Sequence, residues 1–86
     1  MKAPDMLNQV AAIIRERGEV YGDARDNFQD TADRWTVTMG RKVTSEQVAL
    51  CLADLKLARL RATPGHLDSI QDAIGYLALL GEIVTN

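Results

Sequence analysis

The sequence has few of the covalent features that stabilise very small domains. Cys51 is the only cysteine in 86 residues, so an intrachain disulfide and a cysteine-rich zinc site are both excluded. A chain of this length buries only about 60 to 65% of the surface that its unfolded form exposes. Because disulfides and such a zinc site are absent, we expect self-association to complete the hydrophobic core.

The sequence also has no large excess of acidic or basic residues and no long apolar run. Twelve acidic residues face ten basic ones, for a net charge of −2, which argues against a surface that binds duplex nucleic acid over many phosphates. No apolar run approaches the roughly 20 residues of a membrane span, and the start of the chain lacks the apolar stretch of a secretion signal. We therefore expect one domain, residues 1–86, that is cytoplasmic and does not contact a membrane.

Apolar residues recur at helical spacing in four segments. Asp5 is a plausible N-cap of the first helix and Gly18 a stop signal, and Gly40 follows the second segment as a C-terminal cap. Thr44 and Gln47 form a capping box at the start of the third helix, and Pro64 comes after its end. The predicted helices are residues 5–17, 24–39, 44–62 and 66–84.

The predicted fold is therefore all-α, a small four-helix domain with a C-terminal antiparallel helical hairpin, because the link between the last two helices is short. The last helix carries two apolar surfaces. One comprises Leu67, Ile70, Ile74, Leu77 and Val84, and the other Tyr76, Leu79, Leu80 and Ile83. A helix that is apolar on most sides must be buried on most sides, so we expect a homo-oligomeric helical bundle, most simply about a twofold axis. The alternative is that the first helix alone covers the second surface.

A cluster of charged residues is predicted on the hairpin. Lys56 and Arg59 lie one turn apart on the third helix, and Asp68, Asp72 and Tyr76 share one face of the fourth. In an antiparallel hairpin the two cations can meet the two carboxylates in an ion-pair network that fixes helix register. In the functional interpretation the cations hold a phosphate, the carboxylates hold Mg²⁺ or a sugar hydroxyl, and the tyrosine stacks or donates a hydrogen bond.

A second group of candidate ligand-binding residues lies in the predicted connector after the first helix. Tyr21, Gly22 and Asp23 are followed closely by Asn27. The glycine lets the backbone approach a ligand, and amides at the start of the next helix bind anions. The alternative is that Asp23 only caps the second helix while Tyr21 fills the core.

The remaining reactive, aromatic and basic residues considered are predicted to have structural rather than functional roles. Cys51 is expected in the core as an inert residue, and Trp35 is expected to anchor the second helix. Arg15 and Arg17 are expected on the ordinary solvated surface. His66 has no serine and acid at a recognisable spacing, so a hydrolase triad has no support.

The order of these residues resembles small phage and prophage proteins that are catalogued as a domain of unknown function. The resemblance covers nearly all of the chain after the first helix. It is carried by Tyr21-Gly22-Asp23, Asn27-Phe28, Ala32, Trp35, Val48-Ala49, Leu55 to Leu60, Asp68-Ser69, Asp72, Gly75 and Tyr76. This resemblance implies a family and says little about activity.

More remotely, the Lys-x-x-Arg helix and the Asp-x-x-x-Asp-x-x-x-Tyr helix resemble nucleotide-modification-associated domains of phages and MazG-type all-α nucleotide pyrophosphohydrolases. Those enzymes bind Mg²⁺ through a Glu-x-x-Glu and a Glu-x-x-Asp pattern. Here Glu16 and Glu19 have the first spacing but flank Gly18, and no Glu-x-x-Asp follows. The resemblance therefore implies a nucleotide-shaped cleft more than hydrolysis, and it favours a protein without catalytic residues over an enzyme.

Three functions remain open from the sequence. The leading one is a phage-type oligomeric protein that binds a phosphorylated nucleotide or nucleotide signal through Lys56 and Arg59, for sequestration or sensing, without catalysis. Mg²⁺ is the one cofactor considered for it. The second is a divergent Mg²⁺-dependent pyrophosphohydrolase that uses Asp68 and Asp72. The third is a protein-interaction module with no small ligand.

Overall fold

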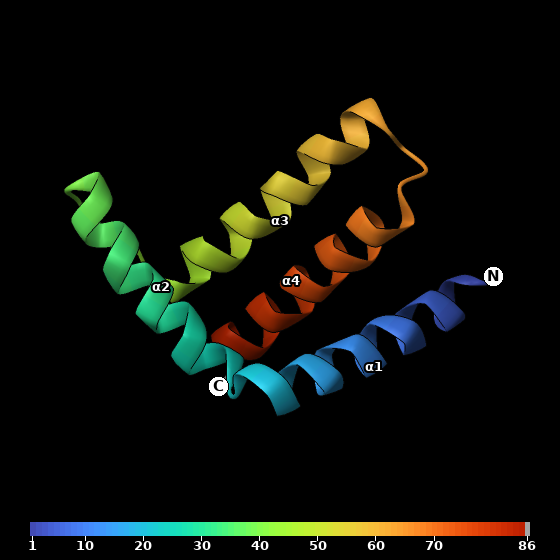
Figure 1. The fold of residues 1–86 in the computed structure, drawn as a ribbon, viewed down its shortest axis with the longest axis horizontal. Helices are drawn as coiled ribbons and strands as arrows, with labels where there is room; N and C mark the ends of the chain where they lie inside the picture. Colours follow the sequence, from blue (N-terminus) through green and yellow to red (C-terminus); the bar gives the residue numbers. More distant parts are fainter. Residues whose placement is uncertain (86) are drawn as a thin grey trace.

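Four α-helices follow one another in the computed structural model, which describes residues 1–85 (Figure 1). They are α1 (Ala3–Tyr21), α2 (Ala24–Met39), α3 (Ser45–Ala62) and α4 (Leu67–Thr85). The described residues contain no strand. The predicted all-α, four-helix fold is confirmed, and the bounds of α2, α3 and α4 lie within two residues of those expected from the sequence.

The first helix is longer than predicted. It begins at Ala3, and the Asp5 carboxylate accepts a hydrogen bond from the Lys2 amide at 3.0 Å inside the first turn. Gly18 does not stop the helix, which ends only where Gly22 adopts a φ of +81° and donates its amide to the Gly18 carbonyl at 2.9 Å. A helical glycine costs only about 1 kcal/mol relative to alanine, whereas a positive φ ends the helix. The connector predicted between Gly18 and the second helix, residues 19–23, is thus reduced to Gly22 and Asp23.

Local capping fixes the ends of α2 and the start of α3. The Asp23 carboxylate accepts the Arg25 amide at 2.9 Å, so Asp23 is the predicted N-cap. Gly40 ends α2 in the left-handed conformation, with φ at +70°. Thr44 and Gln47 form both hydrogen bonds of the predicted capping box, at 2.9 and 3.2 Å. These three sequence signals are confirmed because each satisfies backbone groups that a helix end leaves unpaired.

The largest buried cluster joins α2 to α3. Its buried members are Ala32, Val43 and Val48, and Phe28, Trp35 and Leu52 pack against them. The Thr36 hydroxyl accepts a hydrogen bond from the Val43 amide at 2.9 Å and so holds the turn between the two helices. The predicted role of Trp35 in anchoring α2 is confirmed, although its side chain is only partly buried.

The C-terminal hairpin is the largest contact between helices. Helices α3 and α4 run antiparallel, and α4 lies between α3 and α1, which runs parallel to it (Figure 1). Helix α2 leaves this layer at an angle and opens a V-shaped gap beside α3 (Figure 1). Ser69 and Ala73 are the buried residues of α4, and Gln71 donates to the Gln9 side chain at 2.9 Å to link α4 to α1.

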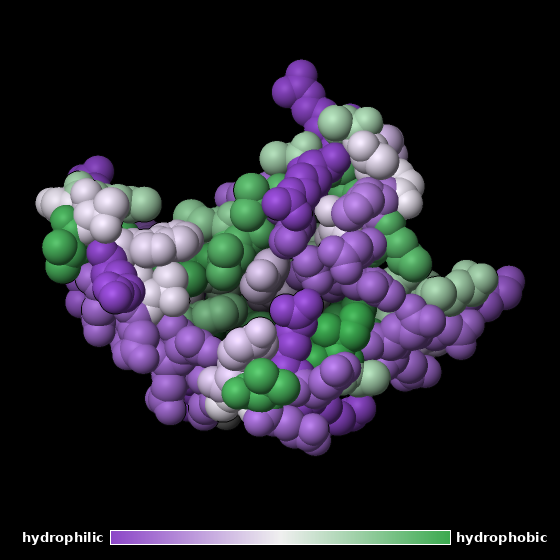
Figure 2. Space-filling model, in the orientation of Figure 1, coloured by the Kyte–Doolittle hydropathy of each residue, from purple (hydrophilic) through white to green (hydrophobic). Residues whose placement is uncertain are grey.

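Many large apolar side chains are exposed. Cys51 was predicted in the core but is exposed, and Leu55 beside it is 49% exposed. Figure 2 shows hydrophobic surface along α3 where it borders the gap beside α2. On α4, Leu77 and Val84 are 47% and 62% exposed. One copy of the chain therefore leaves part of the apolar circumference of α4 uncovered.

None of the four helices, over the residues described, is both long and apolar enough to cross a membrane.

Two glycine substitutions test the helix bounds. Gly18→Ala should raise the free energy of unfolding by about 0.5–1 kcal/mol, because Gly18 is helical and an added Cβ meets nothing within 4 Å. Gly40→Ala should lower it by about 1–2 kcal/mol, because of the positive φ. Urea unfolding at one protein concentration measures both. A destabilising Gly18→Ala would contradict a helix that continues through that position.

Candidate functional site

A cleft of about 590 Å³ lies where the second half of α1, the start of α2 and the middle of α4 meet. Six of the nine residues predicted to bind a ligand line it. They are Tyr21, Gly22, Asp23, Asn27, Asp72 and Tyr76. The structure thus brings the two polar groups of the sequence, which lie far apart along the chain, to one site.

The α1–α2 turn forms one end of this cleft. Gly22 and Asp23 make the turn, and the Asn27 side chain donates to the Tyr21 carbonyl at 3.4 Å. Tyr21 does not fill the core as considered above, since its side chain is 67% exposed. Because α1 continues to Tyr21, the ring lies at the rim of the cleft and remains accessible to a ligand.

Aromatic and small residues line the cleft where α2 and α4 meet. The rings of Phe28 and Tyr76 lie with their centroids 6.5 Å apart at 42°, and both side chains are partly buried. Gly75 also lines the cleft, and a Cβ added there would come within 3.8 Å of Val10 on α1. Gly75 therefore lies where α4 packs against α1, at a distance that a Cβ would turn into an ordinary van der Waals contact.

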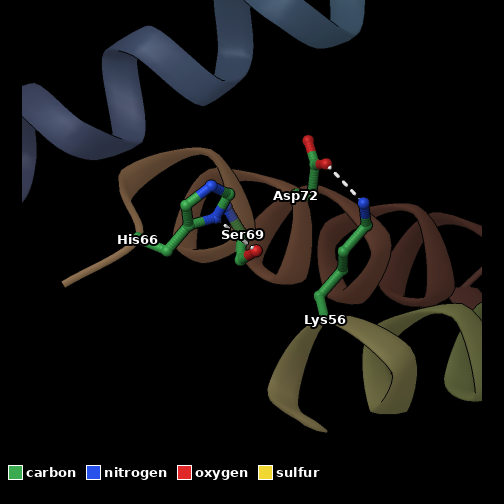
Figure 3. Close-up of polar contacts among 4 residues, drawn as sticks. All are labelled: Lys56, His66, Ser69 and Asp72. Atoms are coloured by element: carbon green, nitrogen blue, oxygen red, sulfur yellow. Dashed lines mark hydrogen bonds and ion pairs between the residues drawn. The ribbon is translucent and has the colours of Figure 1, made fainter. Parts of the chain in front are cut away.

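Lys56 forms the predicted ion pair with Asp72. Its Nζ lies 3.0 Å from the carboxylate, and the two side chains are 13% and 17% exposed. Figure 3 shows Lys56 reaching from α3 across to Asp72 on α4. Because Asp72 lines the cleft and Lys56 does not, the lysine contacts the site through the carboxylate.

The other half of the predicted ion-pair network does not form. Arg59 and Asp68 are both exposed, and within residues 1–85 no ion pair joins them. Neither residue lines the cleft. The hairpin register that brings Lys56 to Asp72 leaves these two side chains on the outer surface of their helices.

Sequence reasoning missed Arg17, which lines the cleft and was assigned to ordinary surface. The signal was present in the spacing of Val10, Ile14, Arg17 and Tyr21, which lie on one face of a continuous helix. It was lost because the helix was ended at Gly18. Arg25 and Gln71 also line the cleft and were not predicted.

His66 and Ser69 are paired, although no hydrolase triad was predicted. The Ser69 hydroxyl lies 2.7 Å from His66 Nδ1, and the Ser69 amide donates to the same nitrogen at 3.3 Å (Figure 3). Ser69 is fully buried, so its hydroxyl cannot reach a substrate. The pair instead satisfies backbone and side-chain groups at the start of α4.

The acidic residues do not gather in one place. Among the residues described, no group of three or more His, Cys, Asp or Glu side chains is arranged to hold a metal ion. Of the two carboxylates considered for Mg²⁺, Asp72 pairs with Lys56 and Asp68 is exposed.

Comparison with known proteins decides the family. The model of a domain of unknown function (DUF6378) matches residues 5–84. The chain belongs to this family. The DUF6378 match includes every residue of the cleft and all of the hairpin except the last residue of α4, so the expected resemblance to a phage family of unknown function is confirmed.

The DUF6378 chain is similar to two phage proteins. It is 32% identical over 79 residues to the Gene 55 protein of Mycobacterium phage D29, covering 91% of this chain and 52% of that protein. It is 35% identical over 77 residues to the Gene 55 protein of Mycobacterium phage L5, covering 87% and 49%. The chain therefore spans about half the length of these curated relatives. No solved structure matches the chain.

The ion pair can be tested by a double-mutant cycle. Lys56→Met alone should lower the free energy of unfolding by about 1–3 kcal/mol, because it leaves the partly buried Asp72 carboxylate unpaired. Adding Asp72→Leu should recover most of that loss, since packed apolar groups often replace such a pair without cost. Urea unfolding of the two single variants and the double variant gives the coupling energy. A coupling energy of zero would show that the pair is not formed.

Proposed function

We propose that this chain binds a phosphorylated nucleotide or nucleotide signal in the cleft between α1, α2 and α4, and holds it without chemical change. The observation that supports the proposal is the convergence of the two polar groups on one cleft that also has aromatic and cationic side chains. Its volume of about 590 Å³ lies within the range of about 300–1,000 Å³ of small-molecule sites.

The aromatic wall suits a planar base. Phe28 and Tyr76 offer ring surface, and Ile14 and Leu79 extend the apolar lining. A base that stacks on a ring gains about 1–3 kcal/mol. The side-chain amide of Gln71 adds a donor and an acceptor at the same wall, which suits the polar edge of a base.

Two arginines suit the phosphate. Arg17 and Arg25 lie in the cleft lining on α1 and α2, and a guanidinium can bind phosphate oxygens in a bidentate manner. Three carboxylates line the same cleft: Asp23 caps α2, Asp72 pairs with Lys56, and Glu82 lies near the end of α4. The two arginines are therefore balanced by the carboxylates of the lining, and a bound phosphate would depend on the geometry of the guanidinium groups rather than on an excess of positive charge.

In this proposal Lys56 does not bind the phosphate itself, as the sequence interpretation had it. It acts as a positioning residue that holds the Asp72 carboxylate at the cleft wall, where the carboxylate can accept a hydrogen bond from a sugar hydroxyl. Arg59 and Asp68 lie outside the cleft and have no part in binding. For a phage protein, holding a nucleotide unchanged would serve to sequester it or to sense its supply.

The proposal is tested first by thermal unfolding of the purified protein with nucleoside mono-, di- and triphosphates and with dinucleotides. Each is compared with the nucleoside that lacks phosphate. We expect at least one phosphorylated compound to raise Tm and its nucleoside to raise it much less. No shift across this panel would overturn the proposal, and release of phosphate or pyrophosphate in the presence of Mg²⁺ would overturn its non-catalytic part.

A matched pair of substitutions on α1 then locates the site. Arg17 lines the cleft, whereas Arg15 is exposed outside it. For the nucleotide that shifts Tm most, Arg17→Gln should raise Kd about tenfold, equivalent to about 1.4 kcal/mol, and Arg15→Gln should leave Kd unchanged. Isothermal titration calorimetry measures both. Equal Kd values for the two variants would place the phosphate elsewhere.

A further inference from the structure

The interior of this chain is built from small side chains. Of its fully buried side chains, Val48 and Ser69 are the largest, and Ala49, Ala53 and Ala73 are buried where α3 and α4 pack. The large leucines lie outside this contact, with Leu50, Leu57 and Leu77 each about half exposed. These three leucines, whose burial would contribute strongly to the free energy of folding, are therefore only half removed from water.

The exposed area is too large for a monomer of this size. A folded monomer of 9.5 kDa is expected to expose about 5,000 Å², whereas this chain exposes 6059 Å². Its radius of gyration of 13.7 Å also exceeds the value of about 12 Å expected for 86 residues. The excess of about 1,000 Å² resembles the area of about 800 Å² that each partner buries in a standard stable interface.

One side of α4 is only partly covered within the chain: Ile70 and Ile74 are partly buried, and Leu77 and Val84 are 47% and 62% exposed. Asp72 contacts α3, and Gln71 and Gly75 contact α1. Successive residues of an α-helix are rotated by about 100° around its axis. The remaining side of α4 therefore carries Ile70, Ile74, Leu77, Gly81 and Val84. No charged residue interrupts this side, and it lies opposite the cleft, which Asp72 and Leu79 line.

The adjoining flank of α3 continues the apolar surface. Leu50 and Leu57 lie two turns apart there, on the other side of Ala53 from the Lys56 ion pair. We define the α3–α4 apolar face as Leu50, Leu57, Ile70, Ile74, Leu77 and Val84. The same flank of α3 also carries Asp54 and Arg61, which are both exposed and, within residues 1–85, belong to no ion pair.

This flank is complementary to itself. Leu50, Asp54, Leu57 and Arg61 follow one another at i, i+4, i+7 and i+11 and form one stripe of a helix. If two such stripes pack antiparallel about a point near Leu57, Asp54 of one copy lies opposite Arg61 of the other, and the reverse pair forms by symmetry. We propose that two copies of this chain associate across a twofold axis through the α3–α4 apolar face, with Asp54 and Arg61 paired between subunits.

The first experiment measures whether this face forms the dimer. Sedimentation equilibrium at micromolar concentration should show a dimer for the wild type, and Leu77→Lys should convert it to monomer because a charge would be buried at the interface. The matched control is Leu55→Lys, since Leu55 is 49% exposed and Leu77 47%, but Leu55 lies two helical turns after Val48, on the side of α3 that packs against α2. Both variants should remain helical, because each substitution is at an exposed position, and circular dichroism checks this.

The second experiment tests the pairing itself. In a dimer of Asp54→Arg, each of the two intersubunit pairs would consist of two arginines. In a dimer of Arg61→Asp, each would consist of two carboxylates. Because like charges repel, each variant alone should dimerise at least about tenfold more weakly than the wild type. Mixing the two variants restores an arginine opposite a carboxylate in both pairs. Native mass spectrometry of an equimolar mixture should therefore show the heterodimer as clearly more than the half of all dimers that random pairing would give.

Several results would overturn the inference. A wild-type monomer at tens of micromolar would do so, as would a dimer that survives Leu77→Lys but dissociates with Leu55→Lys, which would place the contact in the gap beside α2. A mixture of the charge variants with no preference for the heterodimer would refute the Asp54–Arg61 pairing. None of these measurements depends on a ligand, so failure here would leave the proposed nucleotide site to its own test.

Discussion

The close packing of α4 between α1 and α3 determines most of this structure. The buried residues of the α3–α4 contact are small: Ala49 and Ala53 on α3, and Ser69 and Ala73 on α4. Helices that meet through small residues bring their backbones close together but bury little side-chain volume. The cleft, the exposed leucines and the open angle of α2 all follow from a core of this kind.

The helix ends were predictable because their signals are local. Asp23, Gly40 and the Thr44–Gln47 box each satisfy or redirect backbone groups within four residues along the chain, and such effects need no knowledge of tertiary structure. The end of α1 was not predictable in this way. A glycine can sit inside a helix or end it, and Gly18 remains helical while Gly22 has the positive φ. Which of the two ends the helix depends on the contacts that α1 makes.

Burial was harder to infer than helix position. Apolar spacing placed Cys51 in the core, yet it is exposed, because α3 meets its neighbours through alanines and valine on a different side. A helix with apolar residues on several sides does not reveal which side faces its own chain. The same ambiguity applies to α4, where only Ser69 and Ala73 are fully enclosed. Periodicity identified the helices but could not assign their contacts.

The candidate site was predicted in pieces. Residue chemistry identified Tyr21, Asp23, Asn27, Asp72 and Tyr76, all of which line the cleft. Sequence alone could not show that the residues of the α1–α2 turn lie beside those of α4. Their proximity depends on the packing of α1 parallel to α4, which brings the C-terminal end of α1 and the start of α2 next to the middle of α4. Arg17 was missed for the same reason. The hairpin geometry did predict Lys56 with Asp72, since a short loop restricts the register of two antiparallel helices.

The path of the chain also brings four helix termini to one corner. Asp23, Ser45 and Ile83 border a common shallow hollow, so the starts of α2 and α3 lie near the end of α4, and the end of α1 precedes Asp23 by two residues. Partial positive charge at two helix starts then faces partial negative charge at two helix ends. The last turns of α1 and α4 contain no basic residue, so at this corner helix starts rather than cations lie near their ends; the last turn of α2 has none either. The end of α3 lies away from that corner, and its last turn carries Arg59 and Arg61, where cations stabilise an isolated dipole.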